Sequence, residues 1–176
     1  MTLSEILINR RSVRKFEPRP VPRDVVKRLL QLTLATAPSS KNTRSTRFMV
    51  LDEPVRLEIV SRMRDFGSSF LADAPCVVFV FGDTSASDLW LDNAAISATI
   101  LQLAAIEAGL GSCWVHVAGR PQRREEPDGP TAEEHLREFI SIPADWKPLC
   151  AIALGYPVEP SKPHAERDND DKIVWL

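Results

Sequence analysis

The segment 88–108 constrains the fold of this 176-residue chain more than any other. Its leucines, isoleucines and alanines are spread around the whole circumference of a helix, so no broad polar face is left for solvent. Polar side chains interrupt the segment and argue against a membrane span, among them Asp92, Asn93, Gln102 and Glu107. Such a helix must be surrounded, either by its own domain or by a partner subunit.

The rest of the chain alternates between helical and strand patterns. Apolar spacing predicts helices from Ser4, as the cap, towards Arg10, and at 23–35, 54–64 and 131–139, the last with a Thr131–Glu134 capping box. Strands are predicted at 47–51, 76–81, 112–117 and 149–154, and the continuously apolar run 76–81 is expected at the centre of the sheet. We predict one α+β domain, residues 1–176, with a mixed, mainly antiparallel sheet flanked by helices.

Charge is unevenly distributed along the chain. The first 64 residues carry 14 Lys and Arg against 6 Asp and Glu, whereas the remaining residues carry 8 against 18. A basic first third suits nucleic acid or a phosphorylated small molecule, but the exposed aromatic residues of a single-strand binder are missing. We therefore expect small-molecule ligands and no nucleic acid.

Cysteine and histidine usage narrows the possible sites further. Three isolated thiols lie within apolar runs, at Cys76, Cys113 and Cys150, which predicts buried core residues in a reducing compartment. The histidines lack the spacing of metal ligands, so we expect no metal. The first residues do not combine a basic region with an apolar one, and we expect a cytoplasmic protein without a membrane span.

A basic cluster, Arg10-Arg11-Ser12-Val13-Arg14, follows the first predicted helix. Three guanidinium groups this close repel one another unless an anion compensates them, and the arginine fork matches phosphate oxygens two at a time. A solvated basic helix end is the alternative interpretation. The glycine-rich phosphate loops G-x-G-x-x-G after a strand and G-x-x-x-x-G-K-[ST] are absent from the sequence, so any phosphate is held in another way.

Three segments and their order resemble the FMN-dependent nitroreductase family. They are Arg10–Arg14, Ala37-Pro38-Ser39-Ser40-Lys41-Asn42-Thr43-Arg44, and Gly109-Leu110-Gly111-Ser112-Cys113-Trp114-Val115-His116, followed by Gly155-Tyr156-Pro157. The chain resembles a short, minimal member of this family. The resemblance implies a nitroreductase-like fold and an intertwined homodimer, with FMN at the subunit interface and the tail 157–176 extending onto the partner.

The resemblance also implies roles for individual residues. Arg10 and Ser12, with Arg11 nearby, would hold the FMN phosphate or ribityl chain, and Arg14 would stabilise negative charge on the N1–C2=O edge of the reduced ring. The second motif would come from the other subunit and contribute Pro38, Ser39, Ser40, Asn42 and Arg44. Arg44 stands where family members often carry Gln, which puts the shape of the substrate site in doubt.

The third motif would run along the flavin ring near N5. It contributes Trp114, Val115, His116 and Gly119, and a C-terminal cation, Lys162 or else Arg167, would complete the phosphate site. From the residues alone, Trp114 and His116 suit a packed core equally well or better, Arg11 a surface ion pair, and Ser39 and Ser40 a turn. The segment 119–130 is a candidate lid over an open pocket.

The implied activity is that of an NADH- or NADPH-dependent oxidoreductase. Hydride would pass through flavin N5 to nitroaromatics, quinones or similar electron-poor acceptors by a ping-pong mechanism. No catalytic side chain is expected, because the flavin carries the chemistry and Arg14 tunes it. Alternatives are a dehalogenating or flavin-consuming enzyme of the same fold, or a non-catalytic flavin-binding sensor dimer.

Overall fold

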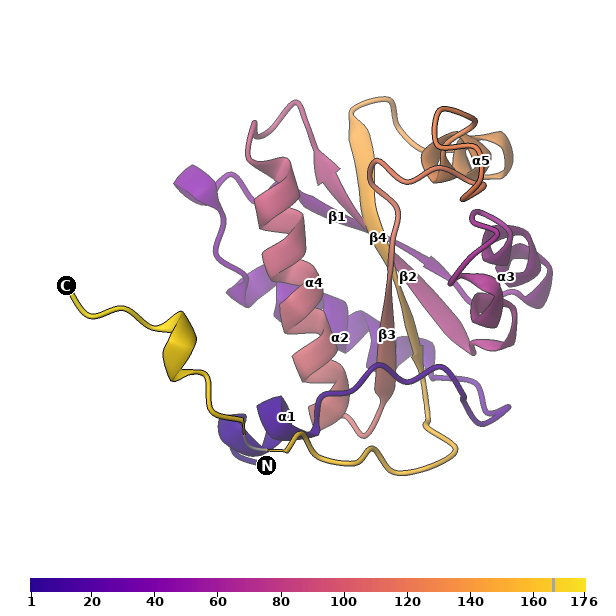
Figure 1. The fold of residues 1–176 in the computed structure, drawn as a ribbon. Coiled ribbons are helices and arrows are strands. Elements are labelled where there is room, and N and C mark those ends of the chain that lie inside the picture. Colours follow the sequence, from indigo (N-terminus) through magenta and orange to yellow (C-terminus); the bar gives the residue numbers. More distant parts are fainter. Residues whose placement is uncertain (166) are drawn as a thin grey trace.

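The computed structural model describes residues 1–165 and 167–176, and its centre is a four-stranded sheet (Figure 1). The strands are β1 (Thr46–Leu51), β2 (Cys76–Asp83), β3 (Gly111–His116) and β4 (Trp146–Gly155), in the order β1-β2-β4-β3. All neighbouring strands run antiparallel, and a parallel bridge joins Ser12 to Ser112 at the outer edge of β3. The expected mainly antiparallel sheet is confirmed.

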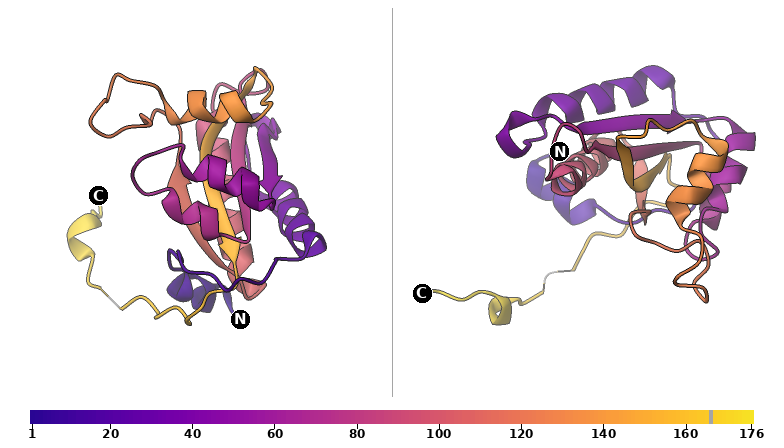
Figure 2. Two further views of the ribbon diagram at one scale, coloured as in Figure 1. Left: turned by 90° about the vertical axis from the view of Figure 1, so that its right-hand side faces the viewer. Right: turned by 90° about the horizontal axis from the view of Figure 1, so that it is seen from above.

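Helices cover both faces of the sheet and give three layers (Figures 1 and 2). On one face lie α2 (Arg23–Thr36) and α4 (Trp90–Glu107), and on the other α3 (Pro54–Ser61) and α5 (Ala132–Phe139). The short α1 (Leu3–Asn9) packs near the C-terminal end of α4. The predicted α+β class is therefore correct.

Alternation along β2 divides the core into two clusters. Val78 and Val80 pack against α2 and α4, whereas Val77 and Phe79 pack against α3 and α5. All eight positions of β2 are buried, because helices cover both of its faces and β1 and β4 pair with both of its edges. The continuous apolar run in the sequence correctly identified this central strand.

Helix α4 is buried on one side only. Ala94, Ala98 and Leu101 are fully buried against the sheet, but Leu91 and Ile96 remain 44% and 38% exposed. The apolar side chains Leu3, Leu7 and Ile8 of neighbouring α1 are also exposed. The chain's own domain thus supplies only part of the cover that this helix requires.

The ends of several elements differ from the expectation. Thr2, not Ser4, caps α1: its side chain accepts a hydrogen bond from the Glu5 amide, and the Glu5 carboxylate accepts one from the Thr2 amide. Helix α3 ends at Ser61, three residues before the predicted boundary. The Thr131–Glu134 capping box of α5 is confirmed.

The C-terminal tail leaves the body of the molecule. Beyond Pro157 it passes α1 and then extends away, as both views of Figure 2 show. It ends in four exposed apolar residues, Ile173 to Leu176, and Trp175 is 92% exposed. Apolar side chains held in solvent like this lack the cover that would stabilise them.

Candidate functional site

The basic segment, residues 10–17, is fixed between the ends of two strands. The Val13 amide donates a hydrogen bond to the Ser112 carbonyl (2.9 Å), and the Glu17 amide donates one to the Tyr156 carbonyl (2.8 Å). These bonds hold the segment across the start of β3, at the lower end of the sheet in Figure 1. The predicted cluster of Arg10, Ser12 and Arg14 is therefore held on a rigid edge.

No carboxylate of the described residues neutralises the guanidinium groups of this segment. Within the described residues, Arg10, Arg11 and Arg14 form no ion pair with a carboxylate. Arg11 and Arg14 are exposed, and the Arg14 guanidinium carbon lies 5.9 Å from the centroid of the Phe70 ring. Uncompensated arginines beside a fixed backbone favour a bound anion such as a phosphate.

The tail brings His164 to this segment. His164 Nε2 lies 2.7 Å from the Arg10 carbonyl oxygen, its amide donates to the Ile8 carbonyl (2.8 Å), and Nδ1 lies 3.5 Å from Arg11 Nη1. Lys162 and Arg167 are exposed in the described tail. No pattern in the sequence pointed to His164, because the tail has no periodicity.

The second motif forms a strained loop at the other end of α4. Lys41, Asn42 and Arg44 adopt positive φ angles of 50°, 52° and 48°, a conformation that costs non-glycine residues about 1–2 kcal/mol each. Ser39 Oγ accepts a hydrogen bond from the Arg44 amide (2.9 Å), which helps to hold this shape. Strain of this kind persists only where surrounding contacts determine the conformation.

Asn93 of α4 is the main support of this loop, and the sequence analysis did not identify it as a site residue. Its side chain is 2% exposed; Oδ1 accepts a hydrogen bond from the Ser40 amide (2.9 Å), and Nδ2 donates to Ser45 Oγ (2.9 Å) and Ser87 Oγ (3.3 Å). The signal in the sequence was a polar residue within a mostly apolar helix.

The two predicted halves of the site lie apart within one chain. The loop 38–44 lies beside Asn93 near the start of α4, whereas the basic segment lies beyond its end, roughly 21 Å along the helix from Asn93 to Glu107 (Figure 1). Pro38, Ser39, Ser40, Asn42 and Arg44 therefore do not converge with Arg10–Arg14 in the described chain.

The third motif presents an open strand edge. In the described part of the chain, no strand pairs with the outer edge of β3 beyond Ser112. The rings of Trp114 and His116 lie parallel on one face, with centroids 6.3 Å apart, and Val115 is buried on the other. Gly119 has a φ of 63°, and a Cβ added there would meet nothing within 4 Å, so the space in front of this turn is open.

The segment 119–130, expected as a possible lid, is fastened at several points. The Asp65 amide donates to the Gln122 carbonyl (2.8 Å), the Arg124 amide to Asp65 Oδ2 (3.0 Å), and the Ala132 amide to the Arg120 carbonyl (2.9 Å). These bonds tie residues 120–124 to the turn after α3 and to the start of α5.

The cysteines are core residues, as predicted. Burial raises the pKa of Cys76 to about 12 and also raises the pKa values of Cys113 and Cys150. A thiol so rarely ionised is a poor nucleophile. Among the described residues, no group of three potential ligands gathers into a metal site, and no helix is long and apolar enough to cross a bilayer.

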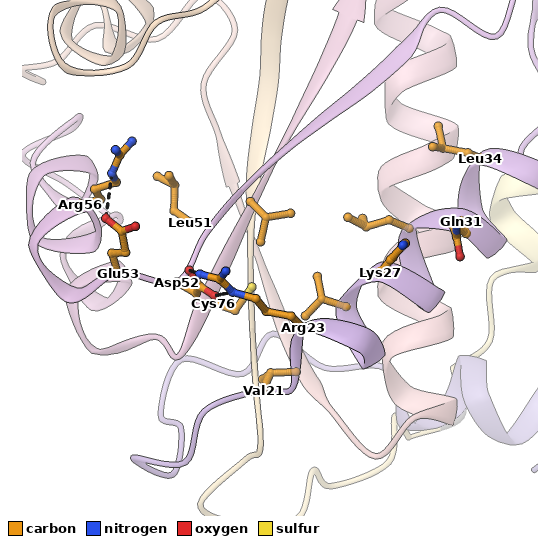
Figure 3. Close-up of a pocket in the computed structure, with 13 residues that line it drawn as sticks. Val21, Arg23, Lys27, Gln31, Leu34, Leu51, Asp52, Glu53, Arg56 and Cys76 are labelled. Atoms are coloured by element: carbon orange, nitrogen blue, oxygen red, sulfur yellow. Dashed lines mark hydrogen bonds and ion pairs between the residues drawn. The ribbon is translucent and has the colours of Figure 1, made fainter.

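An apolar groove lies away from the predicted site residues. It has a volume of about 590 Å³ between α2 and the outer edge of β1, and its lining includes Val26, Leu30 and Leu34 of α2 and Val50 and Leu51 of β1 (Figure 3). Arg23 and Asp52 form an ion pair at its lower end (2.6 Å). No predicted flavin contact of the described chain lines this groove.

Comparison with known proteins connects this site to a family. A family model described as the nitroreductase family matches residues 7–66 and 52–156. A Methanothermobacter thermautotrophicus protein, provisionally named NADH dehydrogenase/NAD(P)H nitroreductase, is 30% identical over 162 residues, covering 90% of this chain and 79% of its own. The structure of an FMN-dependent nitroreductase from Clostridium difficile superimposes with a TM-score of 0.87 at 33% identity, covering 97% of this chain and 96% of its own.

A second solved structure, a nitroreductase-family protein from Desulfovibrio desulfuricans in complex with FMN, shares the fold at a TM-score of 0.79 and 23% identity. Together, the basic segment across the start of β3, the sheet order and the agreement over nearly the whole length show that this chain belongs to the nitroreductase family.

Proposed function

We propose that this chain is an FMN-dependent NAD(P)H oxidoreductase that reduces nitroaromatics, quinones or similar electron-poor acceptors. The observation that carries the proposal is the set of Arg10, Arg11, Ser12 and Arg14, fixed beside the open edge of β3, whose arginines pair with no carboxylate among the described residues. The similar C. difficile protein, which is described as FMN-dependent, supports the same cofactor.

The donor set fits FMN in charge and in shape. Arg10 and Ser12, with Arg11, supply a guanidinium fork and a hydroxyl for a phosphate, and Lys162 or Arg167 of the tail would add a cation. The free edge of β3 at Trp114, Val115 and His116, with open space at Gly119, suits a planar ring. FMN supplies the two-electron hydride chemistry when it is bound.

A homodimer would complete the site. Pro38, Ser39, Ser40, Asn42 and Arg44 lie too far from the basic segment of their own chain, but a second copy could bring its loop to that position. The exposed apolar side chains of α4 and α1 supply a surface that such a copy would cover. The cofactor would then contact both subunits of one FMN-binding domain, residues 1–176.

The tail of one subunit would bind beside strand β1 of the partner subunit. The outer edge of β1 has no partner strand within the described residues, so its backbone can pair with an added strand. The apolar groove alongside it can receive Ile173, Val174 and Trp175, which are exposed in their own chain. We therefore propose that the tail 157–176 extends onto the partner and ends there.

The acceptor is defined only as a class. A CLA biosynthesis enone reductase from Lactiplantibacillus plantarum is 32% identical over 92 residues, 51% of this chain. That relative supports including conjugated carbonyl compounds among the acceptors. The chain's own residues would bind and orient the donor and the acceptor in turn, and the proton can come from solvent.

An absorbance spectrum tests this proposal first. Purified protein should show flavin bands near about 370 and about 450 nm, and anaerobic NADH or NADPH should bleach the longer-wavelength band. Bands that neither nicotinamide bleaches would favour the sensor function, and halide release or loss of FMN during turnover would favour the alternative enzymes. A colourless protein that fails to take up added FMN would contradict the proposal.

A further inference from the structure

A second group of cations lies at the opposite end of β3 from the basic segment. Arg64, half-buried in the turn after α3, donates from Nη1 to the His116 carbonyl (3.3 Å). Arg120 follows β3 in a turn that its amide closes by donating to the Val117 carbonyl (3.0 Å). From Ser112 to Val117 the strand spans roughly 17 Å, so this group is separate from the phosphate-binding segment.

Backbone hydrogen bonds hold the turns that carry these two arginines together. The Asp65 amide, next to Arg64, bonds to the Gln122 carbonyl, and the Arg120 carbonyl accepts from the Ala132 amide. The two arginines therefore project from a connected backbone rather than from independent flexible loops. Such a framework can hold a binding site in place before a ligand arrives.

No carboxylate in the part of the chain that the structure describes neutralises this group. Across residues 1–165 and 167–176, neither Arg64 nor Arg120 forms an ion pair, whereas neighbouring Arg62 pairs with Glu58 (2.6 Å). Burial, and next the charge of Arg120, lower the pKa of Arg64, although Asp65 opposes this shift. Burial, Arg120 and Arg64 together also lower the pKa of His116.

We propose that Arg64 and Arg120 form an anion subsite at the end of β3, which binds a carboxylate or phosphate group of the compound that reacts at the flavin. The inference rests on the proposed function, because it assumes that FMN lies along β3. Guanidinium groups bind both anions in pairs of hydrogen bonds. The parallel rings of Trp114 and His116 provide a flat surface next to this subsite for the uncharged part of that compound.

Matched substrates separate charge recognition from the reaction itself. For the acceptor, 4-nitrobenzoate is compared with uncharged 4-nitrobenzamide, and for the donor, NADH is compared with uncharged 1-benzyl-1,4-dihydronicotinamide. The variants are Arg64→Gln, Arg120→Gln and Arg64→Lys. Arg62→Gln is the control, since it removes an exposed charge two residues from Arg64.

We expect each Gln variant to lower kcat/KM for one anionic member of a pair by about tenfold, while its uncharged counterpart changes less than about twofold. A loss confined to 4-nitrobenzoate assigns the anion to the acceptor, and a loss confined to NADH assigns it to the donor phosphates. Arg64→Lys should retain part of the discrimination, and Arg62→Gln all of it. Equal losses for charged and uncharged members, or none, would overturn the subsite.

Equilibrium binding gives a readout that does not depend on turnover. Benzoate should perturb the flavin spectrum of the FMN-loaded protein at a lower concentration than benzamide does, and the Gln variants should abolish that difference.

FMN content is measured first in every variant. Lack of FMN in the unaltered chain would overturn the proposed function and this inference with it, whereas normal FMN content without charge discrimination would overturn the subsite alone. If Arg64→Gln does not fold, the exposed Arg120 carries the test.

Discussion

Among the cations of the basic segment, Arg14 is the one whose guanidinium lies near an aromatic ring, 5.9 Å from the Phe70 centroid. A positive charge fixed beside a flavin stabilises the reduced, anionic form. We expect Arg14→Ala to lower the flavin midpoint potential and to slow reduction by NADH, as measured by spectroelectrochemistry and stopped-flow absorbance. Lys15→Ala, an exposed charge in the same segment, is the control. An unchanged potential would contradict the role of Arg14.

His116 makes stability depend on pH in a defined direction. Burial, followed by Arg120 and Arg64, lowers its pKa in the folded chain below the ordinary value of 6.5. Between the two pKa values the unfolded chain binds the proton and the folded chain does not, so the free energy of unfolding falls as the pH falls. Neutral His116 makes its full contribution to the free energy of unfolding at pH values above its pKa in the unfolded chain. This contribution is lost as the pH falls through the pKa of His116 in the folded chain.

The pH effect can be isolated by urea denaturation of the unaltered chain and of His116→Asn at several pH values below 6.5. We expect the decrease of the unfolding free energy with acid to be shallower in the variant, because one group with a lowered pKa has been removed. Identical slopes in the two proteins would show that His116 does not contribute.

At the scale of elements, the loop 39–44 depends on helix α4 through one buried amide. Replacing Asn93 by Ala leaves the Ser40 amide and buried Ser45 without this partner, which should cost about 1–3 kcal/mol of unfolding free energy. Because the loop then relaxes from its positive φ angles, FMN affinity should also fall. Urea denaturation and fluorescence titration with FMN measure the two effects, and Arg28→Ala, exposed on α2, is the control. A stability loss with unchanged FMN affinity would contradict the link between loop and cofactor.

The contact between β3 and the basic segment depends on a glycine. A Cβ at Gly111 would lie 2.8 Å from Val13 Cγ2 and 2.9 Å from Val13 Cβ, so Gly111→Ala should displace the segment. Overpacking of this kind costs about 1–3 kcal/mol, and we expect weaker FMN binding as well. The double variant with Val13→Ala should recover part of both losses, as a double-mutant cycle measures. A double variant no better than Gly111→Ala would show that the clash is relieved elsewhere.

The position and the ends of some elements can be predicted from their sequences, whereas those of others cannot. Strand β2 was predictable because burial on both faces leaves a continuous apolar run, and the α5 cap because Thr131 and Glu134 have the capping-box spacing. The α1 cap was misassigned although Thr2 and Glu5 show the same spacing, because Ser4 is an equally good cap by residue type.

Other parts of the site depend on tertiary contacts that leave no local pattern. His164 reaches Arg10 across 154 positions, and the two cations near His116 come from the turn after α3 and the turn after β3. The basic segment itself was predictable, because closely spaced arginines require compensation wherever the fold places them. Its position across β3 was not predicted, because the hydrogen bonds that hold it there join segments about 100 residues apart.

At the scale of the whole molecule, the tail provides the test of assembly. Deleting residues 173–176 removes four exposed apolar residues that contribute little to their own chain, so the folded protomer should keep its circular dichroism spectrum. If the tail binds the partner, the deletion should weaken dimerisation by about tenfold or more, as measured by analytical ultracentrifugation over a range of concentrations.

Dimerisation of the truncated chain as strong as that of the unaltered chain would contradict this arrangement. It would mean that residues 173–176 do not stabilise the interface. Lys172→Ala, which leaves all four apolar residues in place, is the control because it removes an exposed side chain immediately before them.

The three buried cysteines can report how often different parts of the sheet open to solvent. Cys76 lies at the start of β2, Cys113 within β3 and Cys150 within β4, and each is at most 1% exposed. A thiol-labelling reagent can reach a buried sulfur atom only when the elements that cover it move apart. The labelling rate at each site therefore follows local opening around one strand, and mass spectrometry of labelled peptides could rank the surroundings of β2, β3 and β4 by how often they open without any engineered probe.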